Sequence, residues 1–307
     1  YGVTFPVAGL ETSSSVHAMP RSSRSPLVST TWLAEHLSDA DLRVYDCTSF
    51  LVPDPVATFR VESGRGNWSR GHIPGANYVA LQDHLSDADS GLRFTMPRAD
   101  RLAERMAELG TDDASTVVLY STTHYMWATR VWWMLSEIGF TRAFVLDGGF
   151  AKWTRENRPL ALHSSAYPAG NLAVRASAGL FANKTEVAAA ISDPDCVLVN
   201  ALPPGQYRGD PDQPHHGRRG HIRSSVNVPA LSLLTASGTL RPPEEIRRNL
   251  VSRSIVPGKK VICYCGGGVS ATCVALGLTL SGYDRVAVYD GSLNEWARDP
   301  TLPMETC

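Results

Sequence analysis

Long apolar runs, a strong net charge and paired cysteine motifs are all missing from this chain of 307 residues. No apolar run approaches the ~20 residues that a membrane-spanning helix needs. The formal net charge is −1, so the chain has no strong electrostatic attraction for nucleic acid or for an anionic membrane surface. We therefore expect no nucleic acid and no membrane among its partners.

The cysteines also lack a recognisable pattern. There are six, and their scatter along the chain is unlike the framework of a disulfide-rich domain: Cys47, Cys196, Cys263, Cys265, Cys273 and Cys307. No C-x-x-C pair and no neighbouring histidine supports a zinc site. We therefore expect no metal and no cofactor, and a reducing, cytoplasmic location is the simplest expectation.

Composition and length predict a folded chain of two domains. Hydrophobic residues make up 43% and charged residues 19%, as in ordinary globular proteins. A chain of 307 residues is longer than one core usually accommodates. Residues 1–26 are rich in serine, proline and small residues and lack the charged and apolar regions of a secretory signal, so we expect a flexible segment there.

The sequence repeats itself once. GHIPGA at 71–76 is echoed by GHIRSS at 220–225, and LDGGFAKW at 146–153 is echoed by YDGSLNEW at 289–296. Between these markers, TVVLYS aligns with KVICYC, which ends at Cys265. The offset stays near one typical domain length, which indicates two copies of one domain rather than a solenoid.

Each copy alternates short apolar runs with helical patterns. Apolar runs without alternation are typical of strands that are buried on both faces, and strands that alternate with helices predict an α/β fold with an open parallel sheet in each domain. The predicted strands are 42–47, 116–121, 143–147, 196–200, 260–265 and 285–290, and the predicted helices are 98–109, 125–138, 184–192, 244–252 and 269–281. The predicted division is a first domain at 27–155, a linker at 156–178 and a second domain at 179–307.

The most informative stretch begins at Cys265, where a predicted strand stops and three glycines precede a predicted helix. Ligands of open α/β sheets bind at the carboxyl ends of strands, so we expect an accessible thiol there. Backbone amides and a helix N-terminus favour negative charge, which favours the thiolate and an anion beside it. The predicted donors are the amides of the loop and the Ser270 hydroxyl: Gly266, Gly267, Gly268, Val269 and Ser270.

The corresponding loop of the first copy has no thiol and no glycine. It reads Ser121-Thr122-Thr123-His124, whose side chains crowd the amides. One copy is therefore expected to be chemically competent, and the other to form a wall of the cleft.

Together, the repeated GHIPGA motif, the D-G-G-x-x-x-W motif after a strand and the strand–cysteine–glycine-loop–helix unit resemble the tandem-domain rhodanese family of thiosulfate and 3-mercaptopyruvate sulfurtransferases. The resemblance covers residues 27–304. It implies two rhodanese-like domains, the first without a catalytic cysteine, and Cys265 as the nucleophile that forms a persulfide. It also implies a small-molecule sulfur donor and a thiol or cyanide as acceptor. We expect a monomer or a weak homodimer.

Departures from the family leave the substrate open. Gly267 stands where the mercaptopyruvate enzymes have a serine, and Gly266 and Gly267 stand where thiosulfate enzymes of the animal type have basic residues. The family's two carboxylate-binding arginines are out of register, so Arg208, with Arg218 and Arg219, is the candidate substitute. Thiosulfate is the expected donor, and the alternatives are 3-mercaptopyruvate or a persulfide relay that serves a partner enzyme.

Two further alternatives concern single residues. Cysteine phosphatases use C-x5-R, but the position for that arginine is Ala271, which disfavours phosphate chemistry. By the resemblance, His72 lies near the cleft and contributes to substrate binding. From the bare sequence, a histidine between glycine and isoleucine next to a proline more often holds a loop in place.

Overall fold

The computed structural model describes residues 25–54, 58–163, 167–175 and 178–307. All but the last two residues of the segment 1–26 lie outside the described residues. Within the described ranges, no helix is long and apolar enough to cross a membrane. In the same ranges, no three His, Cys, Asp or Glu side chains are grouped in a way that would hold a metal ion.

The first domain is built on a five-stranded parallel sheet in the order β1-β7-β6-β2-β5. The central strand β6 is buried almost completely, as its apolar sequence predicts. The strands are β1 (Leu27–Val28), β2 (Leu42–Asp46), β5 (Asn77–Tyr78), β6 (Thr116–Tyr120) and β7 (Ala143–Leu146).

The second domain repeats this sheet. Its strand order β11-β9-β12-β13-β8 is that of the first domain read from the opposite edge, and every pair is parallel. The predicted duplication and the two open parallel sheets are therefore confirmed. The strands are β8 (Phe181–Ala182), β9 (Cys196–Asn200), β11 (Val226–Asn227), β12 (Lys260–Tyr264) and β13 (Val286–Tyr289).

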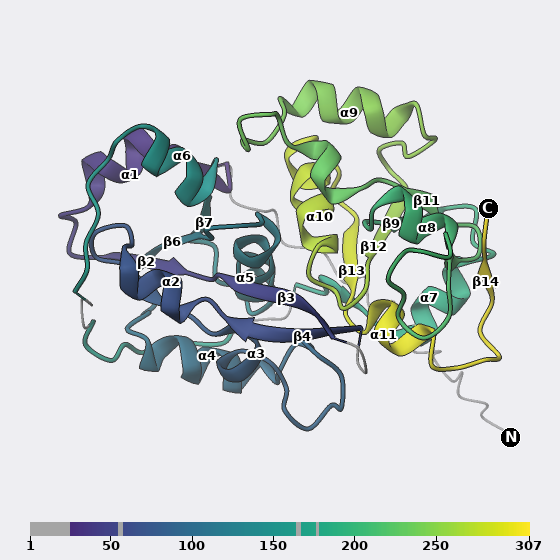
Figure 1. Cartoon of the computed structure of the whole chain (residues 1–307), viewed down its shortest axis with the longest axis horizontal. Coiled ribbons are helices and arrows are strands. Elements are labelled where there is room, and N and C mark those ends of the chain that lie inside the picture. The colour runs from purple at the N-terminus through teal and green to yellow at the C-terminus, as the bar shows by residue number, and fades with distance from the viewer. Residues whose placement is uncertain (1–24, 55–57, 164–166, 176–177) are drawn as a thin grey trace, which may run out of the picture.

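Helices flank both sheets (Figure 1). The first domain has α1 (Thr30–His36), α2 (Arg65–Arg70), α3 (Leu81–His84), α4 (Ala99–Glu108), α5 (Met126–Glu137) and α6 (Gly149–Arg155). The second has α7 (Lys184–Ala190), α8 (Pro204–Arg208), the 3-10 helix η1 (Ala230–Leu233), α9 (Pro243–Val251), α10 (Ala271–Leu280) and α11 (Ser292–Trp296).

The helix signals in the sequence explain where these helices begin and end. Asn183 accepts a hydrogen bond from the Glu186 amide and caps α7, while the Glu186 carboxylate accepts from the Asn183 amide. Helix α10 begins at Ala271, two residues later than predicted, because the loop after Cys265 continues through Ser270.

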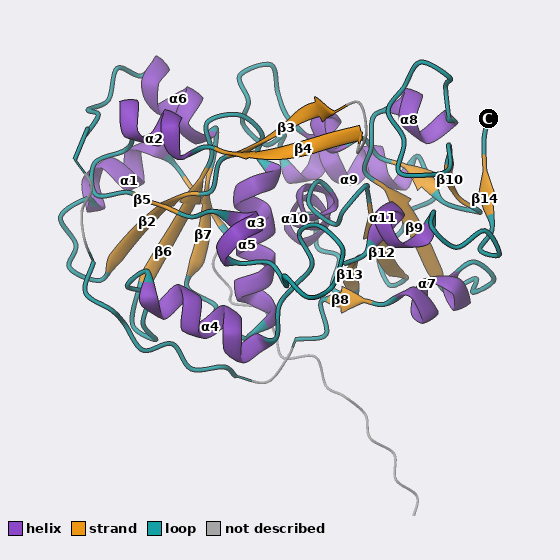
Figure 2. Cartoon of the chain, turned by 60° about the horizontal axis from the view of Figure 1, so that its bottom comes forward, coloured by secondary structure: helices purple, strands orange, loops and turns teal. Residues whose placement is uncertain are grey.

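An antiparallel hairpin extends from the first domain toward the second (Figures 1 and 2). It consists of β3 (Ser49–Asp54) and β4 (Thr58–Ser63), which the sequence analysis did not predict. Pro53 within β3 weakens the strand signal, because proline is confined to the edges of sheets. A second short pair joins β10 (His221–Ile222) to β14 (Met304–Glu305).

The two domains meet where α5 packs against α10. The Thr129 hydroxyl lies 2.7 Å from the Thr272 hydroxyl, and the Trp133 indole donates a 3.1 Å hydrogen bond to the Leu180 carbonyl. Helix α5, which carries Trp133, therefore faces the second domain. The described part of the segment 156–178 is hydrogen-bonded to the first domain, for example from the Gly170 amide to the Ala107 carbonyl.

Candidate active site

Cys265 follows β12 directly and is fixed by its own backbone. Its amide donates to the Ser292 hydroxyl at 3.1 Å, and its carbonyl accepts from the Leu293 amide at 3.1 Å. The first domain uses the same contact, since the Ser121 carbonyl accepts from the Phe150 amide at 3.2 Å. The two loops therefore have equivalent places in the duplicated fold.

The thiol of Cys265 lies on the wall of a cavity and is not at an open strand end. The residue is 2% exposed, so the thiol is accessible from the cavity and not, as expected of a strand end, from open solvent. Phe94, Tyr125 and Met126 of the first domain line the same cavity. The cavity has a volume of about 820 Å³ and is lined by both domains.

The loop after Cys265 presents unpaired backbone donors. Within the described chain, the amides of residues 266–270 donate to no protein acceptor. Helix α10 begins immediately afterwards, and Ser270 at its N-cap makes no side-chain capping bond. Successive amides next to a helix N-terminus form a site that favours an anion. This is the arrangement that the sequence predicts for an anionic substrate.

Each of the three glycines lies so close to a neighbouring group that a side chain would collide with it. A Cβ at Gly266 would lie 2.2 Å from the His216 ring, and one at Gly267 would lie 2.8 Å from the Asn294 amide nitrogen. Gly268 has φ +72°, which favours glycine, and a Cβ there would lie 2.6 Å from the Asp290 carbonyl oxygen. The absence of side chains therefore lets the backbone of the loop lie against His216, Asn294 and Asp290.

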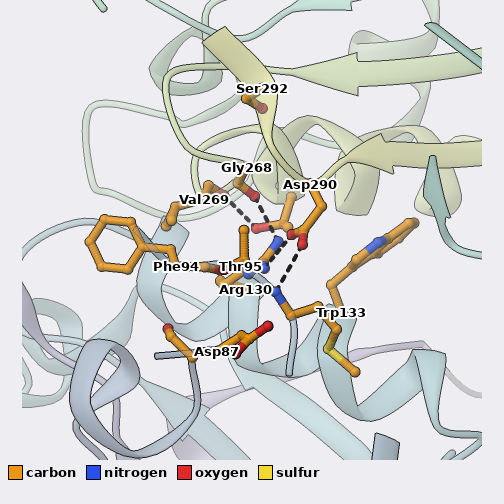
Figure 3. Close-up of polar contacts among 12 residues, drawn as sticks. Asp87, Phe94, Thr95, Arg130, Trp133, Gly268, Val269, Asp290 and Ser292 are labelled. Atoms are coloured by element: carbon orange, nitrogen blue, oxygen red, sulfur yellow. Dashed lines mark hydrogen bonds and ion pairs between the residues drawn. The ribbon is translucent and has the colours of Figure 1, made fainter. Parts of the chain in front are cut away.

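Arg130 of the first domain holds this loop from below (Figure 3). Its guanidinium pairs with the Asp290 carboxylate at 2.6 Å and donates to the carbonyls of Gly268 at 3.3 Å and Phe94 at 2.5 Å. The Asp290 carboxylate also accepts from the Met96 amide at 2.8 Å. Arg130 is fully buried and 21% of the Asp290 side chain is exposed, so this pair crosses the domain interface with its arginine away from solvent.

Sequence reasoning missed Arg130, although a signal was present. It is the one charged residue among the first nine of helix α5, where tryptophan, valine and methionine surround it. A buried arginine requires a partner, so an isolated charge in an apolar helix predicts an ion pair. The pattern does not identify the acidic residue of that pair.

Three other thiols are buried deeply enough to be unreactive. Burial raises the pKa of Cys273 to about 12, and it also raises the pKa values of Cys263 and Cys47. These thiols are therefore protonated near neutral pH and are poor nucleophiles.

His216 packs as a neutral imidazole against the loop of residues 266–270, which we call the catalytic loop. Its Nδ1 lies 2.8 Å from the Asn294 Oδ1, and the Asn294 amide donates to the Gly266 carbonyl at 2.8 Å. Because a carbonyl oxygen only accepts, Nδ1 carries the proton and Nε2 is an open acceptor. Burial lowers the pKa of His216, which keeps the ring neutral near pH 7. The sequence analysis did not identify this histidine.

Arg208 lies outside the cavity. It forms an ion pair with Asp210 at 2.5 Å, and 49% of its side chain is exposed. Arg218 donates to four main-chain carbonyls, and Arg219 donates to two. All three predicted substitutes for the substrate arginines are occupied elsewhere, so Arg208 is not part of the site.

His72 also lies away from the cavity. It is fully buried, stacks on Trp68 with ring centroids 4.3 Å apart, and its Nδ1 lies 2.9 Å from the Trp68 carbonyl. The second copy repeats this packing with His221 stacked on Tyr207 at 3.8 Å. These histidines hold their loops in place, and His72 does not join the substrate site.

Replacing Gly267 with leucine is expected to lower kcat/KM of the reaction at Cys265 about 100-fold, because the side chain collides with Asn294 and displaces the amides. Steady-state kinetics measures this. Gly66→Leu is the matched control, since a Cβ at Gly66 meets nothing within 4 Å. Unchanged kinetics of Gly267→Leu would contradict the role of the loop as an amide cradle.

Comparisons with known proteins agree with this geometry. The model of the rhodanese-like domain matches residues 29–156 and again residues 183–299. The chain is 30% identical to the 3-mercaptopyruvate sulfurtransferase of Escherichia coli over 275 residues, covering 89% of this chain and 95% of that protein. It is 31% identical to the thiosulfate sulfurtransferase of Rattus norvegicus over 288 residues, covering 91% and 94% of the two chains.

A solved structure shows the same architecture. The crystal structure of SseA from Escherichia coli, described as a 3-mercaptopyruvate sulfotransferase with the rhodanese fold, superposes with a TM-score of 0.76 and 28% sequence identity. The match covers 88% of this chain and 99% of that one.

Proposed function

Because this chain belongs to the rhodanese-like family of sulfurtransferases, we propose that it transfers a sulfane sulfur from thiosulfate to a thiol or cyanide through a persulfide on Cys265. The observation that carries the proposal is the set of unpaired amides at residues 266–270, next to a cysteine on a cavity wall. Such amides can donate hydrogen bonds to the anionic sulfur donor, to the anionic leaving group and to the charged persulfide.

The reaction consists of two displacements at sulfur. The Cys265 thiolate attacks the outer sulfur of thiosulfate, the sulfur–sulfur bond breaks, and its electron pair leaves with sulfite. The acceptor thiolate or cyanide then attacks the outer sulfur of the Cys265 persulfide, and the cysteine leaves as a thiolate. The amides of the loop bind the sulfonate oxygens in the first step and the persulfide in the second.

We place His216 beside this chemistry as the group that accepts the proton of an acceptor thiol. Its open Nε2 faces the loop side of the cavity, since a Cβ at Gly266 would lie 2.4 Å from it. A neutral imidazole can take a thiol proton near pH 7, whereas a protonated one cannot.

A second candidate donor is 3-mercaptopyruvate. The names of several relatives favour it, including those from Escherichia coli, mouse and human. The same thiolate would attack the sulfur of this donor, and the carbon–sulfur bond would break instead of a sulfur–sulfur bond. Its electron pair would leave with the enolate of pyruvate, which then takes up a proton. A persulfide relay to a partner enzyme is the third possibility.

The test is a comparison of kcat/KM for thiosulfate and 3-mercaptopyruvate, with cyanide as acceptor and thiocyanate as the measured product. The proposal predicts turnover with thiosulfate at the higher specificity constant. A higher constant for 3-mercaptopyruvate would support the second donor. Negligible turnover with both donors, together with sulfur uptake from a partner desulfurase, would support the relay.

A further inference from the structure

Two arginines line the cavity without a role in the proposed chemistry. Arg93 comes from the loop between α3 and α4 of the first domain, and Arg298 comes from the segment after α11 of the second. The Arg298 guanidinium lies 3.5 Å from the Gly91 carbonyl, two residues before Arg93. The two segments therefore touch across the domain interface at the cavity.

Among the residues that the structure describes, neither guanidinium group has a carboxylate partner. Arg93 donates to the Phe59 carbonyl and Arg298 to the Gly91 carbonyl, and neither forms an ion pair with any residue of the described ranges. Burial is the largest cause of the lowered pKa of His216. The neighbouring His215 and then the positive charge of Arg93 lower it further. The field of Arg93 therefore reaches the cavity wall that holds the catalytic loop.

The rest of the cavity is too large and too apolar for thiosulfate or cyanide alone. At the ~30 Å³ that one water molecule occupies in the liquid, an anion of five heavy atoms fills on the order of 150 Å³. The cavity measures about 820 Å³. Its apolar lining includes Leu51 and Phe59 of the β3–β4 hairpin, and Leu202 and Leu231 of the second domain. Pockets of this size and lining bind organic molecules with a few polar groups.

We propose that Arg93 and Arg298 form a carboxylate-binding site for the sulfur acceptor, which is an organic thiol with a carboxylate and a short apolar body. This inference rests on the proposed function, because the acceptor thiolate attacks the Cys265 persulfide. The carboxylate stays on the two guanidinium groups, the apolar body lies along the wall, and the acceptor leaves as a persulfide. Guanidinium groups bind carboxylates through paired, charge-assisted hydrogen bonds.

The experiment compares three acceptors with thiosulfate as donor: 3-mercaptopropionate, 2-mercaptoethanol and cyanide. Sulfite release is the common measurement, and the thiol rates are compared per total thiol at pH 7, where both thiols arrive protonated and His216 takes the proton. The wild-type protein should prefer 3-mercaptopropionate over 2-mercaptoethanol by about 10-fold in kcat/KM, the value of one charge-assisted contact. In Arg298→Gln and Arg93→Gln the preference should fall to about 1.

Arg248→Gln is the matched control, because Arg248 is exposed on α9 and does not line the cavity. It should keep the preference of the wild type. The inference is overturned if cyanide turnover is normal and the wild type shows no preference for 3-mercaptopropionate. It is also overturned if both Arg298→Gln and Arg93→Gln keep the preference of the wild type. Since Arg93 also supports the hairpin, Arg298→Gln is the decisive variant.

A binding measurement separates this inference from the proposed function. Calorimetric titration with 3-(methylthio)propionate, which cannot accept sulfur, should show binding that weakens about 10-fold in Arg298→Gln. Absent turnover with intact binding would contradict only the proposed function. Equal affinity of the wild type and the variant would contradict the carboxylate site.

Discussion

Replacing Cys265 with serine is expected to lower sulfur transfer by ~10³-fold or more, because a hydroxyl at this position cannot carry a sulfane sulfur. The loop and its amides stay in place, since the backbone of residue 265 makes the contacts to Ser292 and Leu293. The measurement is steady-state thiocyanate formation from thiosulfate and cyanide, with circular dichroism to show that the fold is kept.

Cys263→Ser and Cys273→Ser are the controls for this result. Burial raises the pKa values of both thiols, so neither contributes a nucleophile near neutral pH. Both variants should keep activity within about 3-fold, although a buried hydroxyl costs some stability. An equal loss of activity in all three variants would indicate a structural cluster instead of a single nucleophile.

Replacing Arg130 with methionine has the second-largest expected effect. The change leaves the Asp290 carboxylate without its partner and the Gly268 and Phe94 carbonyls without their donor. Breaking a buried pair costs about 3–5 kcal/mol of unfolding free energy. Because Gly268 belongs to the catalytic loop, kcat/KM should fall about 100-fold as well.

Denaturant unfolding and steady-state kinetics on the same samples measure both effects. Arg130→Lys should recover part of the stability, since the charge remains, but less of the activity, because an ammonium lacks the planar fork of donors that reaches three groups. Arg98→Met is the control, because the Arg98–Asp100 pair is exposed and its loss should change neither quantity. Wild-type stability and activity in Arg130→Met would contradict the role of this pair.

The parts of the fold that the sequence predicts are those with a local cause. The central strands β6 and β12 are buried on both faces, so their apolar runs are readable without any knowledge of packing. The loop after Cys265 is equally readable, because consecutive glycines at the end of a strand have few structural reasons other than close approach of the backbone.

The parts that the sequence did not predict depend on how the two domains pack. The burial of Cys265 and the pairing of Arg130 with Asp290 both arise at the domain interface, between residues far apart in the chain. Arg208 was selected by its distance from a motif, but its neighbour Asp210 satisfies its charge. The position of a residue in a motif predicts which part of the fold it belongs to. The residue with which a charged side chain pairs depends on the tertiary structure.

The central claim is that the sulfhydryl of residue 265 alone carries the transferred atom. Mass spectrometry of the intact protein and of its peptides, after incubation with thiosulfate and removal of excess donor, tests this claim directly. We predict one added sulfur atom, located on Cys265 and removed by cyanide. No added mass, or sulfur on any other cysteine, would contradict the account.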